Sequence, residues 1–287
     1  METNKKRQHY VWKNYLKPWT TDDKIWCKRH NSIFNPSLDK IALEKYFYEV
    51  KPINEIEIRI ATRFIEMNPP ENRPFLIKKL AQYIYICNSS DEYLRKNALE
   101  NYHDRIENSI GTALEYLYKK DISFLNDTNN RINFFYFVSL QYFRTKCMLE
   151  RTVTGLSYLP VSPPKEIEGM YDNENIVRVI AMLMDECTAN WMIESTKIYF
   201  IETDYEFIAS DQPIINIHSK NEITFEQVKS MEYYYPITPH LALFITAKDF
   251  SNKRIDKIET DKYNRLLYDK SHEQVYSFSK ETLLSFL

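Results

Sequence analysis

The stretch that decides the fold class is YYYPITPHLALFIT, residues 233–246. Its two apolar runs, Tyr233–Ile237 and Leu241–Thr246, flank the turn residues Thr238-Pro239-His240, which predicts two β-strands joined by a short turn. Further strand-like runs lie upstream at Lys197–Ile208 and Ile214–Ile217. Strands joined by such short connections pair antiparallel, so the C-terminal third predicts a small, mostly antiparallel sheet.

The centre of the chain has the apolar spacing of helices instead. Apolar residues recur every three or four positions, as in a helix with one buried face. The expected helices are Phe75–Cys87, Ser90–Lys120 with a break near Tyr102, Arg131–Leu149, Asn175–Glu194, Asp256–Asp269 and Lys280–Phe286, with the clearest linker at Leu159–Pro164. Aromatic residues lie on most sides of Arg131–Leu149, which predicts a buried central helix.

Helices in the middle of the chain and strands after them favour an α+β fold. In this fold a mainly helical body packs on a small, mostly antiparallel sheet formed largely by the C-terminal third. We expect a single domain over residues 1–287, with the helical body at about 40–195 and the sheet-rich part at about 196–250. The N-terminal motif, residues 7–28, is expected to pack near that sheet. Within it, the alternating run Lys24–Lys28 predicts a strand that joins the late sheet and brings the two ends of the chain together.

Composition excludes several classes of protein. The chain has only 3 glycines in 287 residues, far apart at Gly111, Gly155 and Gly169. Walker, Rossmann and G-x-S-x-G motifs depend on closely spaced glycines and are therefore absent. The N-terminus lacks the apolar core of a signal peptide, and no apolar stretch approaches the roughly 20 residues that span a bilayer. The four cysteines are widely spaced and, in the absence of a signal peptide, are expected to be reduced thiols. We therefore expect a cytoplasmic protein with no membrane association.

Four clusters of polar residues among apolar ones are candidate sites. They are residues 7–19 with His9, Asn14 and Tyr15; the pair Ile106-Glu107, expected to open an apolar helix; Gln141–Thr145 with Arg144; and Phe207–Ile214 with Ser210, Asp211 and Gln212. The last cluster follows an apolar strand, and loops at strand ends often carry function on a rigid scaffold.

The main candidates each have a chemical and a structural interpretation. Asp211 is an acid/base or metal ligand, or else a turn residue before a proline. Arg144 grips a phosphate in bidentate fashion, or else forms a buried ion pair with Glu107 or Asp211. His9 is a general base or metal ligand, or else a hydrogen-bonded histidine at a helix start. No H-x-x-x-H or H-E-x-x-H pattern occurs, so the metal ligands remain unknown, although a divalent metal is compatible with these residue types.

In this order, the motifs resemble a bacterial family of proteins of unknown function, the family numbered 4238. The resemblance is carried by H-Y-V-x-x-x-Y-L at residues 9–16, Q-x-x-R-T at 141–145, F-I-x-S-D-x-P at 207–213 and P-x-x-P at 236–239, and it spans roughly residues 7–246. The sequence departs from the family pattern at Trp12, Trp19 and Ala209, which leaves the polar residues in place. The family name implies no reaction. If the dispersed polar residues of the family motifs converge, they form a pocket with a base, an anion clamp and a carboxylate. Proteins of this kind resemble accessory proteins of bacteria, which gives a role in phage defence or as a toxin as the context for a hypothesis.

These observations support two hypotheses. In the first, the protein is a defence or toxin effector hydrolase acting on a phosphate-bearing substrate, as a nuclease or a nucleotide hydrolase. Its catalytic residues would be His9, Glu107, Arg144 and Asp211, and its substrate-binding residues Asn14, Tyr15, Gln141, Ser210 and Gln212.

In the second hypothesis, the protein is a non-catalytic binding or sensor protein, and the same residues form a buried polar network. Residues 1–30 hold eight basic and three acidic residues, although the net charge of the chain is −2. These basic residues, interleaved with Trp12 and Trp19, would bind a partner protein or nucleic acid.

Overall fold

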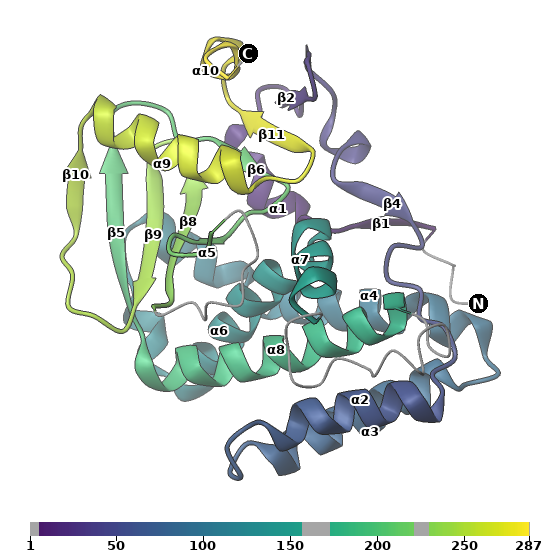
Figure 1. Ribbon diagram of the computed structural model, residues 1–287. Helices are drawn as coiled ribbons and strands as arrows, with labels where there is room; N and C mark the ends of the chain where they lie inside the picture. Colours follow the sequence, from purple (N-terminus) through teal and green to yellow (C-terminus); the bar gives the residue numbers. More distant parts are fainter. Residues whose placement is uncertain (1–5, 157–172, 221–229, 287) are drawn as a thin grey trace.

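The computed structural model describes residues 6–156, 173–220 and 230–286. A sheet stands at one end of a helical body, and the helix α9 (Lys257–Lys270) lies across the sheet's outer face (Figure 1). The predicted α+β class, with most of the sheet in the C-terminal third, is confirmed. The predicted linker at residues 159–164 lies outside the described residues.

The main sheet has five strands in the order β10-β5-β9-β8-β7. These strands are β10 (Lys253–Ile255), β5 (Lys197–Thr203), β9 (Leu241–Thr246), β8 (Glu232–Thr238) and β7 (Ile215–Asn216). All neighbours pair antiparallel except β10 and β5, which are parallel. The sheet is therefore mostly antiparallel, as its short connections predict.

The main sheet is buried on both faces, which explains the continuous apolar runs in its central strands. In β9, Leu243 and Ile245 pack into the core shared with the helical body, whereas Ala242 and Phe244 pack on the side of α9. Successive side chains of a strand point to opposite faces, so a sheet covered on both sides needs a continuous apolar run. The run at residues 241–245 meets that need.

A second sheet joins the two ends of the chain. Its order is β3-β2-β11-β6, made of β3 (Ser32–Phe34), β2 (Trp26–Arg29), β11 (Gln274–Ser277) and β6 (Ala209–Ser210). The predicted early strand thus pairs with a late one, but in a sheet separate from the main sheet. The helix α10 (Lys280–Leu284) follows β11.

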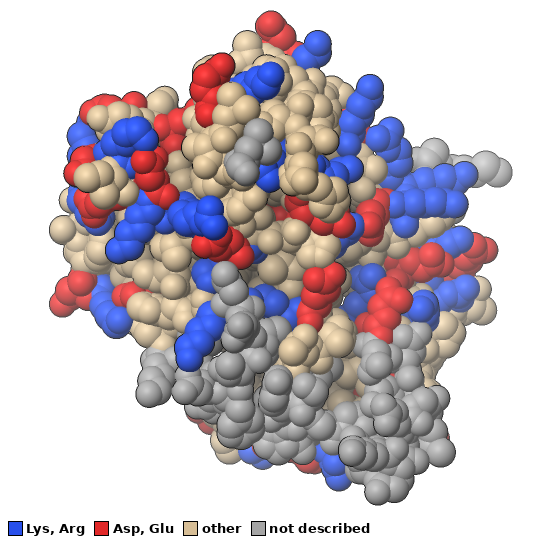
Figure 2. Space-filling model, turned by 45° about the horizontal axis from the view of Figure 1, so that its top comes forward, with Lys and Arg blue, Asp and Glu red and all other residues tan. Residues whose placement is uncertain are grey.

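Two short strands of the N-terminal segment, β1 (Arg7–His9) and β4 (Leu43–Lys45), pair antiparallel although more than 30 residues separate them in the chain, and the 3-10 turn Leu38–Lys40 precedes β4. Two basic residues of this segment contact Asp39: Arg7 donates a hydrogen bond to the backbone carbonyl of Asp39, and Lys13 forms an ion pair with its carboxylate. Figure 2 shows Lys and Arg side chains gathered along one edge, with Asp and Glu side chains beside them. On this face, acidic side chains interrupt the basic surface.

The helical body is built from seven helices within the described residues. They are α2 (Glu55–Glu66), α3 (Arg73–Cys87), α4 (Glu92–Ser109), α5 (Gly111–Tyr118), α6 (Thr128–Phe143), α7 (Lys146–Leu156) and α8 (Asn173–Ser195), with a 3-10 turn at Ser123–Asn126. The helix α6 packs along α8 and is central, as its aromatic sequence predicts: Phe134, Phe135 and Phe137 are fully buried.

Three predicted helix boundaries are wrong. The break expected near Tyr102 lies at Ile110, because the Ser109 hydroxyl donates to the carbonyl of Ile106 and competes with the helical pattern at the end of α4. Glu107 therefore lies near the end of α4 and does not open a helix. The helix expected over residues 131–149 is two helices, because the Thr145 hydroxyl accepts from the backbone of Met148 and starts α7.

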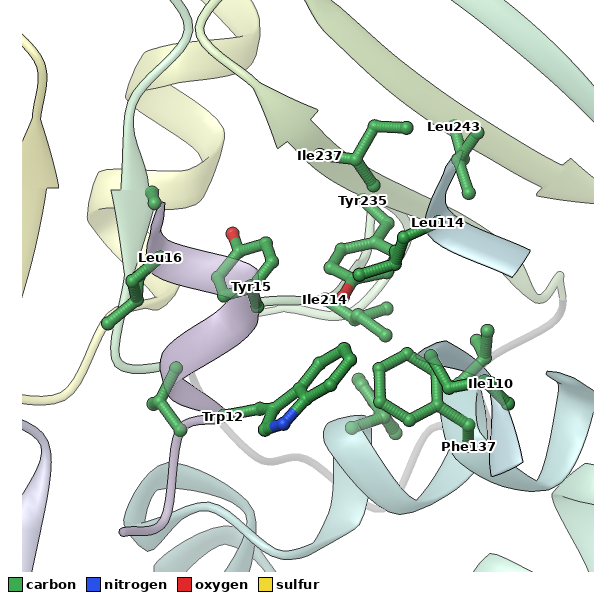
Figure 3. Packing of buried hydrophobic residues seen from close by; sticks show 14 of the residues in the cluster. Trp12, Tyr15, Leu16, Ile110, Leu114, Phe137, Ile214, Tyr235, Ile237 and Leu243 are labelled. Carbon is green, nitrogen blue, oxygen red and sulfur yellow. The ribbon is translucent and has the colours of Figure 1, made fainter. Parts of the chain in front are cut away.

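The residues that follow β1 join the sheet to the helical body. The short helix α1 (Lys13–Leu16) continues as a 3-10 turn, Lys17–Trp19. Tyr15 stacks on Tyr235 of β8 with ring centroids 5.2 Å apart, and Trp12 meets Phe137 of α6 edge-on at 5.2 Å (Figure 3). The Trp19 indole donates to the carbonyl of Phe207 at 2.8 Å. The aromatic residues of this motif are therefore core residues.

Candidate functional site

A cavity of about 1030 Å³ opens within the helical body, between α3, α4, α6, α7 and α8. Its lining combines basic and aromatic side chains with a few buried polar ones. The basic residues are Lys78, Lys79, Arg105, Arg144 and Arg178, and the aromatic ones are Tyr48, Tyr83, Tyr85, Tyr102 and Phe143. Its volume lies at the upper end of the range of small-molecule sites, about 300–1,000 Å³.

Arg144 forms part of the cavity floor. It caps the C-terminus of α6, where its guanidinium Nη2 donates to Glu107 Oε1 at 2.5 Å and to Gln141 Oε1 at 3.0 Å. Burial raises the pKa of Glu107, and the neighbouring guanidinium opposes that rise. Of the two partners that the sequence leaves open for Arg144, the structure shows Glu107. Three predicted site residues are thus brought together: Glu107, Gln141 and Arg144.

Two consecutive acids of α8 lie beside them. Asp185 is 4% exposed and Glu186 is 1% exposed. Lys79 of α3 forms an ion pair with Glu186. The Lys79 Nζ atom also makes a cation–π contact with the Tyr102 ring, 4.3 Å from its centroid. Burial, together with the negative charge of Glu186, raises the pKa of Asp185 to about 7. The carboxyl of Asp185 is therefore poised between its two protonation states near neutral pH.

Four lining residues carry a buried side-chain polar atom with no hydrogen-bond partner among the described residues. These atoms are Tyr83 Oη, His103 Nδ1, Arg144 Nε and Asp185 Oδ1. Burial lowers the pKa of His103 well below its usual range, so the imidazole is neutral at physiological pH. Buried polar groups in folded proteins are nearly always paired, so each unpaired atom on the lining calls for a partner such as a water molecule, an ion or a ligand.

The serine-aspartate motif has a different environment. Asp211 accepts hydrogen bonds from the backbone N–H groups of His272, Glu273 and Gln274, at 2.8, 2.7 and 2.9 Å. Burial raises the pKa of Asp211, and these three hydrogen bonds oppose the rise. Both carboxylate oxygens are thus occupied in fixing the start of β11.

Ser210 and Gln212 complete a turn between β6 and β7. The Ser210 hydroxyl donates to the carbonyl of Gln212 at 2.8 Å and accepts from its backbone N–H at 3.1 Å. The Gln212 side chain donates to the carbonyl of Tyr142 at 3.1 Å and accepts from the Thr145 hydroxyl. Gln212 therefore ties the strand-end turn to the junction of α6 and α7, one residue beyond Arg144.

The three predicted residues of the N-terminal motif do not line the cavity. His9 lies in β1, not at a helix start, and burial together with nearby Lys13 lowers the pKa of its imidazole to about 4. Asn14 is exposed on α1, whereas Tyr15 is buried against Tyr235. The backbone of His9 does approach the site, since its carbonyl accepts from the hydroxyl of the lining residue Tyr48 at 3.2 Å.

Sequence reasoning missed His103, Lys79 and Asp185. The adjacent acids 185 and 186 directly follow the apolar run at residues 179–184, and that pattern indicates buried carboxyl groups. His103 and Lys79 carry no comparable signal, because single polar residues on half-exposed helices are common. Within residues 6–156, 173–220 and 230–286, no three His, Cys, Asp or Glu side chains are grouped as metal ligands would be. No helix in this same part of the chain is long and apolar enough to cross a membrane.

Comparison with known proteins identifies one family. The model of the family described as "Protein of unknown function (DUF4238)" matches residues 7–281, nearly the whole chain. The comparisons with curated proteins and with solved structures found no match. The ordered motifs at residues 9–16, 141–145 and 207–213 had indicated the same family.

Proposed function

The chain belongs to the DUF4238 family, and from its helical cavity we propose that it binds a nucleotide-sized, phosphate-bearing small molecule. The observation that carries the proposal is the set of unpartnered buried atoms on the lining, at Tyr83, His103, Arg144 and Asp185. Each such atom costs about 1–3 kcal/mol when it is buried without a partner. A ligand that pairs with them would recover that cost.

The distribution of charge supports an anionic ligand whose phosphate lies at the cavity rim. Deep in the cavity, Arg144 is neutralised by Glu107 and Lys79 by Glu186. The exposed residues Lys78 and Arg105 also line the cavity, and neither forms an ion pair within the described part of the chain. A phosphate would be attracted to these two rim cations more than to the internally paired floor.

The aromatic lining supports a flat ring as the other end of the ligand. Tyr102 and Phe143 line the cavity beside the polar floor, and Tyr85 lies exposed at the rim. Aromatic side chains stack on nucleobases irrespective of base identity, at about 1–3 kcal/mol per base. The polar atoms of the floor would then meet the hydrogen-bonding edge of the ring.

A nucleotide is a better match than a polynucleotide, because the cavity between the helices has about the volume of a small-molecule site. Hydrolysis and binding without reaction use the same cavity and differ only in the fate of the bound ligand. Hydrolysis of the bound phosphate ester is the reaction that we propose to test, because it would release phosphate or nucleoside.

Isothermal titration calorimetry with a panel of ribonucleoside monophosphates and triphosphates tests the proposal, with phosphate and nucleoside release measured on the same samples. The double variant Lys78→Gln, Arg105→Gln should weaken nucleotide binding about tenfold at low salt. The control is Lys257→Gln, Arg265→Gln on α9, which removes the same charge outside the cavity lining. Absence of binding by the wild type, or equal losses in both double variants, would refute the proposal.

A further inference from the structure

We infer that Asp185 lies on the cavity floor as a carboxyl that keeps its proton at pH 6 and loses it by pH 8, so that its protonated form is a hydrogen-bond donor that selects the ligand and makes ligand binding depend on pH. The inference rests on the proposed function, since it identifies the side chain of that same site that forms a selective hydrogen bond with the ligand. It does not depend on the identity of the nucleobase.

The count of charges around the two acids carries the inference. Asp185 and Glu186 are consecutive and both buried, and the nearest cation, Lys79, forms its ion pair with Glu186. The other two cations that line this part of the cavity are also engaged. Arg144 pairs with Glu107 at 2.5 Å, and Arg178 pairs with Glu174 at 3.0 Å. One carboxyl group is therefore left without a cation of its own, and a buried carboxyl in that position keeps its proton.

The groups that face Asp185 from the other helices do not supply a missing positive charge. These groups are Lys79 on α3, Tyr102 on α4, and Tyr136, Ser139 and Arg144 on or at the end of α6, and His103 on α4 lines the same cavity. Burial keeps His103 neutral by lowering its pKa, and it raises the pKa of both tyrosines. The Ser139 hydroxyl donates to the backbone carbonyl of Asp185 at 2.9 Å, and its hydrogen bond to the Asp185 carboxyl opposes the rise in the pKa of Asp185 without supplying a charge. The side-chain oxygen Oδ1 has no partner among the described residues.

A protonated carboxyl on the floor donates a hydrogen bond, so it selects a ligand with an acceptor at that point, such as a ring nitrogen or a carbonyl oxygen. When the acid ionises, the donor is lost and a negative charge faces an anionic ligand. Binding should therefore weaken as the pH rises from 6 to 8. A side-chain amide at this position would keep a donor at every pH, so the variant Asp185→Asn separates this mechanism from other titrations.

The test combines one measurement on the free protein with one measurement of ligand binding. The first follows the side-chain carboxyl carbon of Asp185 by NMR through a pH titration of the free protein, the signal being assigned as the one missing in Asp185→Asn. The second measures the dissociation constant of adenosine monophosphate at pH 6 and pH 8. The matched control is Asp104→Asn, which changes another acid that lines the same cavity.

We expect Asp185 to titrate near pH 7 and the wild-type dissociation constant to rise about tenfold more than that of Asp185→Asn between the two pH values. The difference between the proteins is the decisive quantity, because the phosphate of the probe itself titrates near pH 6. The variant Asp104→Asn should keep the wild-type dependence. A titration of Asp185 below pH 5, or an equal pH dependence in Asp185→Asn and wild type, overturns the inference. If the wild type binds no nucleotide at pH 6, the proposed function fails, and the titration of the free protein alone decides the inference.

Discussion

Replacing Asp185 by Asn should abolish a pH dependence of stability that the wild type carries. The pKa of Asp185 is about 7 in the folded protein, against 3.8 as its ordinary value. Because the folded state holds the proton more tightly, this group stabilises the fold fully below pH 3.8 and loses that contribution as the pH rises through 7. At 1.36 kcal/mol per pKa unit, the loss between pH 5 and pH 8 is about 2.5 kcal/mol.

Urea denaturation of wild type and Asp185→Asn at pH 5, 6, 7 and 8 measures this effect. The variant cannot ionise at this position. The free energy of unfolding of Asp185→Asn minus that of the wild type should therefore increase by about 2.5 kcal/mol from pH 5 to pH 8. The variant Asp104→Asn is the control, since it removes an acid of the same cavity lining that does not adjoin Glu186 in the chain. A difference between Asp185→Asn and wild type that stays constant with pH would refute the charge count around Glu186 and Lys79.

Further predictions concern residues that the sequence singled out. Arg144→Ala should destabilise the protein by about 3–5 kcal/mol in urea denaturation, because it leaves Glu107 buried without its partner; the added change Glu107→Gln should restore part of the loss, and the absence of any restoration would argue against the pair. Asp211→Ala should cost at least about 3 kcal/mol in urea denaturation, from about 1 kcal/mol for each of the three backbone N–H groups that it strands, and a loss below about 1 kcal/mol would contradict these hydrogen bonds. Tyr15→Phe should change the unfolding midpoint little, since the buried Tyr15 hydroxyl has no hydrogen-bond partner among the described residues, and a large loss would contradict that environment.

The fold class could be predicted because periodicity reports burial. The run at residues 241–245 is apolar at every position because both faces of its strand are covered, and the run at 134–137 because α6 is central. Boundaries were harder to predict because they depend on single side-chain hydrogen bonds. Neither the Ser109 hydroxyl that competes with α4 nor the Thr145 hydroxyl that starts α7 leaves a periodic signal.

The candidate site could be predicted only in part, for a physical reason. A motif shows that a polar side chain is needed but does not show what that side chain contacts. Buried polar side chains occur both where they hold two segments of the chain together and where they line a binding pocket. Asp211 and Gln212 bond to the backbone of distant segments and hold the strand-end turn in place, whereas Arg144 borders a cavity.

The motif of the strand-end turn and the motif of the cavity contact each other at the junction of α6 and α7. This contact gives a physical reason for both motifs to occur in one sequence pattern. Thr145 bonds to Gln212, and the residue before it, Arg144, forms the cavity floor with Glu107. A loss of the Gln212 contact would therefore shift the end of α6 and with it the guanidinium. On this argument Gln212→Ala should weaken nucleotide binding even though Gln212 does not line the cavity, whereas Asn14→Ala, on the exposed face of α1, should not. Calorimetric titration of both variants at pH 6 checks the coupling, and an unchanged affinity in a folded Gln212→Ala protein would show that the strand-end turn and the cavity are independent.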